Sequence, residues 1–459
     1  MKKVLLALLV LILLIVGGLA IFIATFDADR YRPFVVGKLQ DAIKHPVSLE
    51  HMALGWRGGL ALQLKGLTIA DQIPSAEPLI HVDSADAVVR LAPLLHQDVQ
   101  ITAIVLKSLQ AHISRDAQGQ INLLGLAVAG APAAAPSQTA PGTTPLALEI
   151  SSFRIDDGAV HWTDAMTRPP TDLVVKDVDL QVRNIAAGRP MDVTLAASIG
   201  AASRNLHVAG RLTLPGPSAP GSIEQLTVKL NRMGLDHVLP KAAAGEPQLH
   251  GTITASVQGK AATLDPQQVM QAVSASGRLQ LTDAKIENLN LLRAVFERIS
   301  MVPGLMAIIE TQLPPEYQAK FAAKDTVLQP IDAGIEVERG ALQFQDLTVT
   351  TDAFALSGHG VVALSGGVNI QAVLRVERTL SAALILKTKE LQGIANSAGE
   401  LEIPLTIQGQ LPRLVPMPDV AYLTSRLLAN KFQDVVGGLL QRALERHTTP
   451  DQPAAAPAQ

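Results

Sequence analysis

Apolar and polar residues alternate along most of the chain after residue 60, with the period of two that is typical of β-strands. In residues 191–199, Met, Val, Leu, Ala and Ile alternate with Asp, Thr, Ala and Ser. The same alternation recurs at 206–214, 249–257, 368–376 and 401–407. Parallel sheets instead carry continuous apolar runs. The pattern therefore predicts a mainly β protein, built on an antiparallel sheet with one solvated face.

A seven-residue unit recurs three times, as GAVHWTD at 158–164, GRLQLTD at 277–283 and GALQFQD at 340–346. We expect each unit to be a glycine turn that opens a strand ending in Asp, because glycine accepts the positive φ of hairpin turns. Asp156 and Asp157, which precede the first unit, are interpreted as turn formers. The repeated strand pair predicts a sheet that is extended by addition along one axis.

Two stretches carry apolar residues at helical spacing instead. Residues 288–313 are broken at Pro303 and Gly304, which predicts a helical hairpin as an insert between strands. Residues 419–447 predict a C-terminal amphipathic helix that begins after Asp419. This helix is expected to cover the end of the sheet, and the same apolar stripe would also permit docking on a membrane or a partner.

The N-terminal residues 4–26 contain no charge over twenty-three positions, which exceeds the ~20 residues needed to cross a bilayer. We favour an uncleaved membrane anchor over a signal peptide, because Ile21, Phe22 and Ile23 interrupt any small-x-small cleavage site. Basic residues on the two sides of this segment nearly balance, so the charges leave the orientation open. Nearly all of the protein is expected to lie on one side of the membrane.

Composition narrows the functional classes further. The chain of 459 residues is 48% hydrophobic and has a formal net charge of -3, which gives no electrostatic basis for binding nucleic acid. It has no cysteine, which excludes disulfides, iron–sulfur clusters and thiolate zinc sites. Only 3% of the residues are aromatic, so the apolar positions are almost wholly aliphatic.

The sequence lacks the common catalytic and nucleotide-binding motifs, including H-E-x-x-H, G-x-S-x-G, the Walker loop and the dinucleotide glycine pattern. We therefore expect neither an enzyme nor a cofactor. His45 and His51 are interpreted as a solvated surface pair rather than a metal site. Asp177 and Asp179 form a D-x-D sequence that can hold a divalent cation in some transferases, but they are expected to lie on the solvated face of a strand.

Several segments resemble the AsmA-like family of the Gram-negative envelope. They are DRYRPFVVGKLQDAIKHPVSLEHMALGW at 29–56, GGLALQLKGLTIAD at 58–71, ADAVVRLAPLL at 85–95, RDAQGQINLL at 115–124, and the GAVHWTD and GALQFQD units. The matching positions in the first two segments are Tyr31, Pro33, Pro46, Val47, Trp56, Leu60, Leu62, Leu64, Leu67 and Ile69. The sequence departs from the family at Lys44 and His45, where Gly-Arg usually precedes Pro-Val.

This resemblance implies an inner-membrane anchor and a periplasmic body with an elongated, curved sheet, whose apolar concave face carries phospholipid tails toward the outer membrane. The alternation alone fits a β-sandwich equally well, since a sandwich buries the same faces against each other. The residues expected to line the groove are Val193, Leu195, Leu206, Val208, Leu212, Leu214, Ile253, Val257, Leu342, Phe344, Ile370, Leu374, Ile403 and Leu405.

Two functions follow. The first is non-enzymatic lipid transfer between inner and outer membranes, which maintains outer-membrane lipid homeostasis, with phospholipid as ligand and an outer-membrane or periplasmic protein as a potential partner. The second is a membrane-tethered scaffold for outer-membrane protein or lipopolysaccharide assembly. The expected parts are a cytoplasmic tip (1–3), the anchor (4–26), β regions (27–126, 146–287 and 323–415), a disordered linker (127–145), the helical insert (288–322), the amphipathic helix (419–447) and a disordered tail (448–459).

Overall fold

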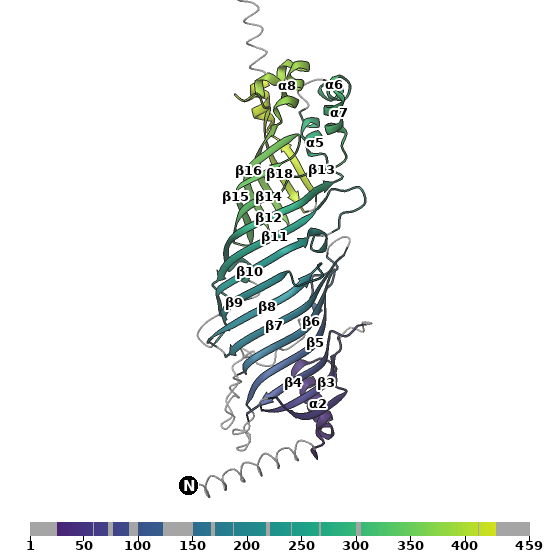
Figure 1. Cartoon of the computed structure of the whole chain (residues 1–459), viewed down its shortest axis with the longest axis vertical. Coiled ribbons are helices and arrows are strands. Elements are labelled where there is room, and N and C mark those ends of the chain that lie inside the picture. Colours follow the sequence, from purple (N-terminus) through teal and green to yellow (C-terminus); the bar gives the residue numbers. More distant parts are fainter. Residues whose placement is uncertain are drawn as a thin grey trace, which may run out of the picture. The chain divides into compact units, whose positions relative to one another are not determined.

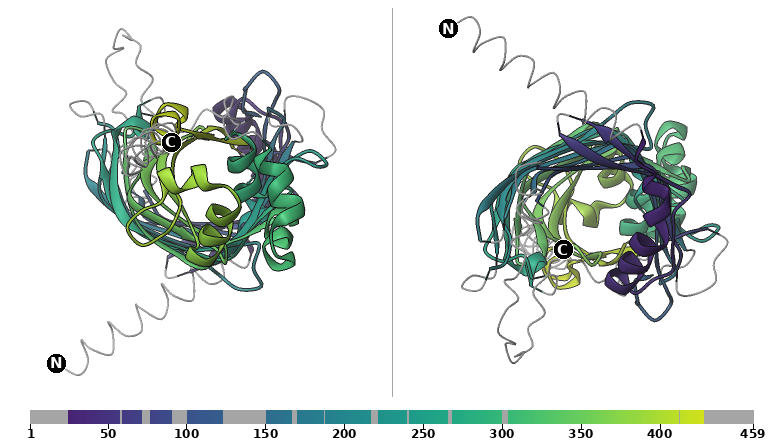
Figure 2. Two further views of the ribbon diagram at one scale, coloured as in Figure 1. Left: turned by 90° about the horizontal axis from the view of Figure 1, so that it is seen from above. Right: turned by 90° about the horizontal axis from the view of Figure 1, so that it is seen from below.

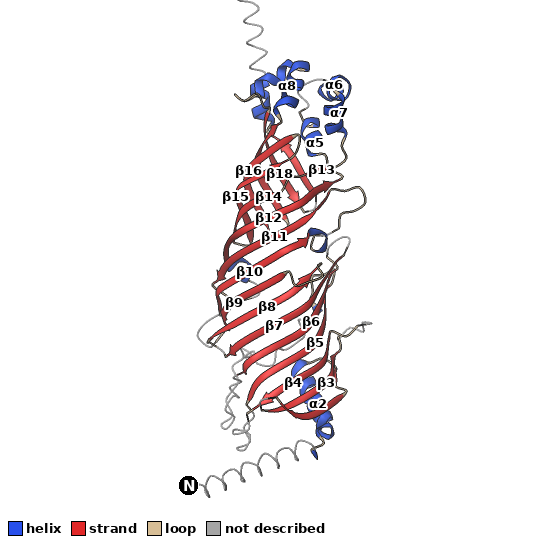
Figure 3. Cartoon of the chain, viewed as in Figure 1, coloured by secondary structure: helices blue, strands red, loops and turns tan. Residues whose placement is uncertain are grey.

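The computed structural model describes residues 25–57, 59–71, 77–90, 100–122, 150–166, 170–186, 188–216, 221–239, 241–265, 268–299, 304–411 and 413–427. These residues are mainly β (Figure 3), and their 19 strands form one large, open and mostly antiparallel sheet. The predicted mainly β class and antiparallel sheet are thereby confirmed. No helix within the described residues is long and apolar enough to span a bilayer. The predicted anchor and linker lie outside them, apart from Thr25 and Phe26 of the anchor.

The chain divides into two compact units. The N-terminal unit comprises residues 1–244, 251–280 and 336–340, and the C-terminal unit comprises 245–250, 281–335 and 341–459. The strands of the N-terminal unit follow one another as neighbouring rungs (Figure 1). Its elements are η1 (Ala28–Tyr31), α2 (Arg32–Ile43), β1 (Val47–Ser48), β2 (His51–Trp56), β3 (Leu60–Ile69), β4 (Ile80–Val89), β5 (Ile101–Arg115), β6 (Ile150–Asp164), β7 (Thr171–Ile185), β8 (Pro190–Ile199), β9 (Leu206–Thr213), β10 (Ser222–Gly234), η3 (Leu235–His237), α4 (Val269–Ala272), and most of β11 (Gln248–Ala261) and β12 (Val273–Glu287).

One strand pair departs from the predicted antiparallel order. β5 and β6 are parallel, with Leu106 opposite Ile155 and Arg115 opposite Asp164. Parallel neighbours need a connection of a dozen or more residues. The stretch between Arg115 and Ile150 supplies it, so the long segment interpreted from sequence as a linker joins two adjacent strands.

A row of β-bulges crosses the N-terminal unit. Asp157 in β6, Asp177 in β7 and Arg232 in β10 adopt positive φ where the register between strands shifts. Gly66 in β3 and Ser108 in β5 also adopt positive φ, at points where the register with β4 is kept. Each bulge inserts an extra residue and thereby reverses the alternation beyond it. Bulges also bend strands and increase their twist, and these strands follow a curve when viewed end on (Figure 2).

The bulges correct two of the expected glycine turns. Gly158 lies inside β6 and Gly277 inside β12, so neither opens a hairpin. Asp157 is a bulge residue with φ 57° rather than a turn former. The third unit matches the prediction, because Arg339 and Gly340 both have positive φ between β14 and β15, which is typical of a tight hairpin turn.

The C-terminal unit is a sheet with a packed helical layer. Its remaining elements are α5 (Leu291–Glu297), α6 (Leu305–Gln312), α7 (Pro315–Ala322), β13 (Thr326–Val327), β14 (Ile331–Glu338, shared with the other unit), β15 (Ala341–Thr350), β16 (Phe354–Ala363), β17 (Gly367–Val376), α8 (Arg378–Lys387), η4 (Lys389–Ile394), β18 (Glu402–Gln410) and β19 (Arg413–Pro418). Buried side chains from these helices and from β16 to β18 form one hydrophobic core. Leu374, Leu380, Leu384 and Leu391 are each 0% exposed within it.

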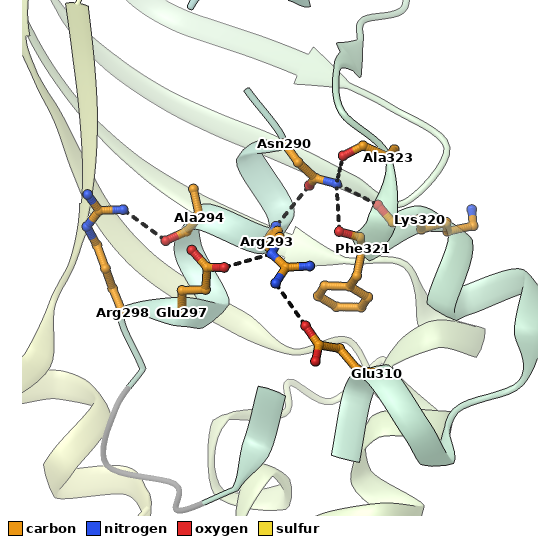
Figure 4. A network of polar contacts seen from close by, with 9 residues as sticks. All are labelled: Asn290, Arg293, Ala294, Glu297, Arg298, Glu310, Lys320, Phe321 and Ala323. Carbon is orange, nitrogen blue, oxygen red and sulfur yellow. Dashed lines mark hydrogen bonds and ion pairs between the residues drawn. The ribbon is translucent and has the colours of Figure 1, made fainter. Parts of the chain in front are cut away.

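Polar contacts hold α5, α6 and α7 together (Figure 4). The Asn290 side chain caps α5 by accepting from the Arg293 amide at 2.9 Å, and its Nδ2 donates to the Lys320 carbonyl of α7 at 2.8 Å. The Arg293 guanidinium pairs with Glu297 on its own helix and with Glu310 of α6, at 2.7 and 2.8 Å. The three helices therefore occupy the predicted insert as a connected group.

Several helices lie in regions that were predicted to be β, among them α2 and α8. The segment that contains α2 was assigned to a β region, although Pro33 in its first turn is a typical helix-start residue. α8 and η4 interrupt the predicted C-terminal β region. Glu377 caps α8 by accepting from the Thr379 and Leu380 amides, and Leu380 and Leu384 are four residues apart on its buried side. The spacing of Leu380 and Leu384 is the sequence feature that could have predicted this helix.

The predicted C-terminal helix begins at the expected residue. The Asp419 side chain accepts from the Tyr422 amide at 2.9 Å, and the helix runs from residue 420 to the last described residue, Leu427. Leu423 and Leu427 contribute to the core of the C-terminal unit, with 0% and 5% of their surfaces exposed. The rest of the predicted helix, up to residue 447, lies outside the described residues.

Substitutions at Asp177 test whether the positive φ of this bulge residue costs stability. A β-branched residue tolerates φ 50° poorly, so Asp177→Val should lower the free energy of unfolding by about 1–2 kcal/mol, whereas Asp177→Gly should be close to neutral. Thr194→Val, at an exposed position of ordinary strand geometry, is the matched control. Chemical denaturation measures all three. Equal stability of the Val and Gly variants would contradict the strained conformation.

Candidate lipid-binding face

The strand register aligns aliphatic residues into a continuous row across ten strands of the N-terminal unit, from β2 to β11. Each member lies opposite the next on the neighbouring strand, and cross-strand partners share a face of the sheet. The row runs Met52, Leu64, Ala85, Leu106, Ile155, Leu180, Leu195, Val208, Val228 and Val257. With strands ~4.8 Å apart, nine spacings give a row of about 43 Å.

A second row runs beside the first on the same face. Its members are Leu54, Leu62, Ala87, Ile104, Phe153, Val182, Val193, Gly210, Leu226 and Gly259. No position of either row carries a polar side chain. Beyond the bulges, a shorter row continues the apolar face through Ile69, Ile80, Ala111, Val160, Val175 and Ile199.

The bulges keep this face apolar over the whole length of the strands. In β6, Ile155 and Val160 differ by five positions, so strict alternation would place them on opposite faces. The extra residue at Asp157 brings Val160 back to the face of Ile155. Ser108 and Asp177 have the same effect in β5 and β7. The bulges therefore join two apolar half-faces into one.

Over much of the apolar face, no helix or strand of the described residues packs on top of the sheet. At its start, Val35 and Val36 of α2 pack against Met52, Leu54 and neighbouring apolar residues. From β5 to β10, the main contacts of each strand are with the strands beside it. The aliphatic residues there, including Leu195 and Val208, are only half-buried. A contiguous apolar surface of this kind is typical of a site that binds an apolar ligand or partner.

The structure unites the predicted groove residues of the N-terminal unit. Alternation and register place Val193, Leu195, Leu206, Val208, Leu212, Ile253 and Val257 on the apolar face, and Leu214 follows directly after β9. All eight are half-buried. The groove residues predicted from sequence did not include Ile155, Leu180 and Val228, which belong to the same row. In β6 and β7 the bulges interrupt the alternation, so the local pattern predicted the apolar face of these two strands only in part.

The predicted groove residues of the C-terminal unit behave differently. Leu374, Ile403 and Leu405 are 0%, 0% and 3% exposed in the core beneath the helices, and Ile370 packs against that core. Their assignment to an open groove is therefore wrong for the structure described, because side chains from α5 to α8, η4 and the last helix fill the same core. Leu342 and Phe344 on β15 remain half-buried.

The family model described as AsmA family matches residues 1–297, which is more than half of the chain. The chain belongs to the AsmA family. No curated protein matches it. The match covers the strands that carry the apolar rows and ends at the last residue of α5. Membership of the AsmA family, together with the large groove-like sheet, is consistent with an envelope-associated role in lipid transport or envelope assembly.

Lys44 stands where the AsmA family usually has glycine, and its backbone keeps a conformation that glycine favours. Lys44 ends α2 with φ 62°, a conformation that favours glycine. His45 is only 3% exposed, and its Nδ1 lies 3.1 Å from the Ile43 carbonyl oxygen. The prediction of a solvated histidine pair is therefore wrong for His45, while His51 is exposed and contacts Asp29 at 3.0 Å.

The opposite face of the sheet is polar. A hollow of about 570 Å³ lies there, lined mostly by polar-face residues that include Arg154, Asp179, His207 and Lys229. Asp179 pairs with Arg204 at 2.7 Å, and Asp177 occupies its bulge. No group of three or more potential metal ligands occurs within the described residues. The D-x-D sequence thus serves a bulge and an ion pair on the polar face.

An ion pair fixes the ends of the parallel strands β5 and β6. The Arg115 guanidinium donates to both carboxylate oxygens of Asp164, and Asp164 is 6% exposed. The hydrogen bond from Arg115 lowers the pKa of Asp164 below its usual value, while burial opposes this effect. The pair stabilises the carboxyl ends of the two parallel strands, where the chain leaves β5 and β6.

Truncation of matched leucines tests which face is open. Leu374→Ala should lower the free energy of unfolding by about 2–5 kcal/mol, because it leaves a cavity in a closed core. Leu195→Ala should cost less than half as much, since its side chain is already half in contact with solvent. Denaturant titration of both variants measures the difference. A large, equal loss would show that the face around Leu195 is packed against protein.

Acid sensitivity tests the Arg115–Asp164 pair. The folded pKa of Asp164 is lowered, so its stabilising contribution is present above the unfolded pKa and is lost as the pH falls below about 4. We expect Asp164→Asn to lower stability at pH 7 and to flatten the loss of stability below pH 4. Asp192→Asn removes an exposed pair with Arg211 and should change little. Identical pH profiles for the two variants would refute the role of Asp164.

Proposed function

We propose that the protein carries phospholipid along the apolar face of its N-terminal unit, as a non-enzymatic protein anchored in the bacterial inner membrane with its body in the periplasm. One observation carries the proposal: two aliphatic rows cross ten strands without a polar interruption, and from β5 to β10 the described chain does not cover them. In this way the protein would maintain outer-membrane lipid homeostasis.

The dimensions and chemistry of the face suit acyl chains. One leaflet of a bilayer contributes about 15 Å of hydrocarbon, which is half of the ~30 Å core. A row of about 43 Å is therefore long enough for tails to move along it without leaving an apolar surface. The rows contain Leu, Val, Ile and Ala with two glycines, one Met and one Phe, so few rings obstruct a flexible chain.

The headgroup has a different environment. Charged residues such as Lys107 and Arg154 lie on the opposite, polar face, and no charged side chain occurs in either row. A lipid bound by its tails would keep its headgroup in water at the margin of the face. We therefore propose that the N-terminal unit recognises tails with little selection among phospholipid headgroups.

One observation favours the alternative function, a scaffold for envelope assembly, for part of the chain. The C-terminal unit fills its apolar face with its own side chains, among them Leu374, Leu380 and Leu391, as a scaffold would. In the proposal this unit does not carry lipid, and it is the part suited to contact an outer-membrane or periplasmic partner protein. A scaffold for outer-membrane protein or lipopolysaccharide assembly remains the alternative for the whole protein if the N-terminal unit binds no lipid.

Photocrosslinking tests the lipid path. A benzophenone amino acid at Leu195 or Val208 should form adducts with phospholipid in the membranes of intact cells. The same group at Thr194 or His207 should not, because these adjacent residues lie on the polar face. Leu195→Arg should reduce the adducts at Val208 severalfold, whereas Thr194→Arg should leave them unchanged. Absence of adducts at Leu195 and Val208, or equal adducts on both faces, would rule out the path.

A further inference from the structure

The first helix of the N-terminal unit carries an exposed aromatic surface of its own. Phe34 is 67% exposed and Tyr31 is 52% exposed, which is unusual for two neighbouring aromatic residues in a chain with 3% aromatics. The Lys38 ammonium lies 5.9 Å from the centre of the Phe34 ring. Arg30 is exposed at the same end of the helix. The surface formed by Arg30, Tyr31, Phe34 and Lys38 thus combines apolar rings with long basic side chains.

This aromatic surface adjoins the apolar N-terminal segment directly. Phe26 is the last of the twenty-three uncharged residues, and its ring stacks on the Tyr31 ring with 5.7 Å between centroids. Phe34 follows Tyr31 by one helical turn. If residues 4–26 cross the bilayer, Phe26 lies at the boundary of the hydrocarbon, and Tyr31 and Phe34 lie at the level of the lipid headgroups.

We propose that α2 rests on the headgroup region of the membrane through Tyr31 and Phe34, and so holds the β2–β3 end of the apolar face against the lipid. This inference rests on the proposed membrane anchor and lipid path. Amphipathic aromatic rings are enriched at the interface of bilayers, and basic side chains reach past them toward the phosphates. Both features occur together on this helix.

The attachment of η1 and α2 to the sheet explains how such docking would position the apolar face. Asp29 accepts from the Met52 amide at 2.9 Å and contacts His51 at 3.0 Å, and the His51 hydrogen bond lowers the pKa of Asp29. Gln40 donates to the Val47 carbonyl at 3.2 Å. On its sheet side, α2 packs Val35 and Val36 over the first residues of both apolar rows.

α2 therefore has two apolar sides with different partners. The side of Val35 and Val36 covers Met52 and Leu54, at the start of the lipid path, whereas Phe34 points away from that core. A helix that contacts both the membrane and the first members of the rows is placed where a lipid would leave the bilayer. The occupant of the aromatic surface is thus a lipid surface rather than another protein.

The absence of cysteine from the chain permits a direct test with single labels. The full-length variants Phe34→Cys, Tyr31→Cys and Thr194→Cys are labelled with an environment-sensitive fluorophore and reconstituted into vesicles of phosphatidylethanolamine and phosphatidylglycerol. We expect labels at residues 34 and 31 to emit at shorter wavelength and to lose emission when brominated lipid is included. The label at residue 194, on the polar face, should retain its emission. If the labels on α2 respond no more than the label at residue 194, the docking is refuted.

Crosslinking in the same vesicles separates this inference from the lipid path. If Leu195 forms lipid adducts while the labels on α2 stay in water, the lipid path holds and the docking of α2 is wrong. If the labels on α2 are quenched and Leu195 forms no adduct, the docking holds and the lipid path is wrong. Phe34→Tyr, which keeps an interfacial aromatic ring, should preserve adduct formation at Leu195, whereas Phe34→Glu should reduce it severalfold.

Discussion

A β-sheet that binds an apolar ligand along one face must keep that face continuously apolar, and within the proposed function this constraint governs the N-terminal unit. Strict alternation would fail wherever a strand kinks, because one extra residue exchanges the two faces. Ser108, Asp157 and Asp177 introduce such irregularities at corresponding points of the neighbouring strands β5, β6 and β7. Because they correspond across these three strands, the exchange occurs in all three together, and the apolar rows continue on the far side. Curvature and continuity of the face thus have a common physical origin.

The two units use the same strand chemistry in opposite ways. In the N-terminal unit, α2 covers only the first strands, and the face from β5 to β10 stays half-buried. In the C-terminal unit, α5 to α8 and the start of the last helix complete a core around Leu374 and Ile403. A filled core gains stability from packing, whereas an unfilled face gives up that stability and retains a surface for an apolar ligand. Within the proposed function, this difference separates the lipid-carrying part from the part that carries none.

Several polar side chains hold the elements of this arrangement together. Arg115 and Asp164 connect the carboxyl ends of the parallel strands β5 and β6, and Asn290 ties α5 to α7. Asp29 fixes η1 to β2, which places Tyr31 and Phe34 at a defined position relative to the first strands. Each of these side chains bonds to backbone or to a charge, so each stabilises a junction between elements.

The sequence alone determined the β class, the antiparallel order of most strands, the start of the last helix at Asp419 and the apolar character of residues such as Leu195 and Val208. These are local properties, because a period of two or a capping residue depends only on near neighbours. Tertiary structure decided the parallel pairing of β5 with β6 and the place of Gly158 inside a strand. It also determined the difference in burial between two leucines in equally alternating strands: Leu195 is half-buried, whereas Leu374 is fully buried. Helices α5 to α8, η4 and the start of the last helix share a core with Leu374, whereas no described helix shares a core with Leu195, and strand periodicity carries no information about such long-range packing.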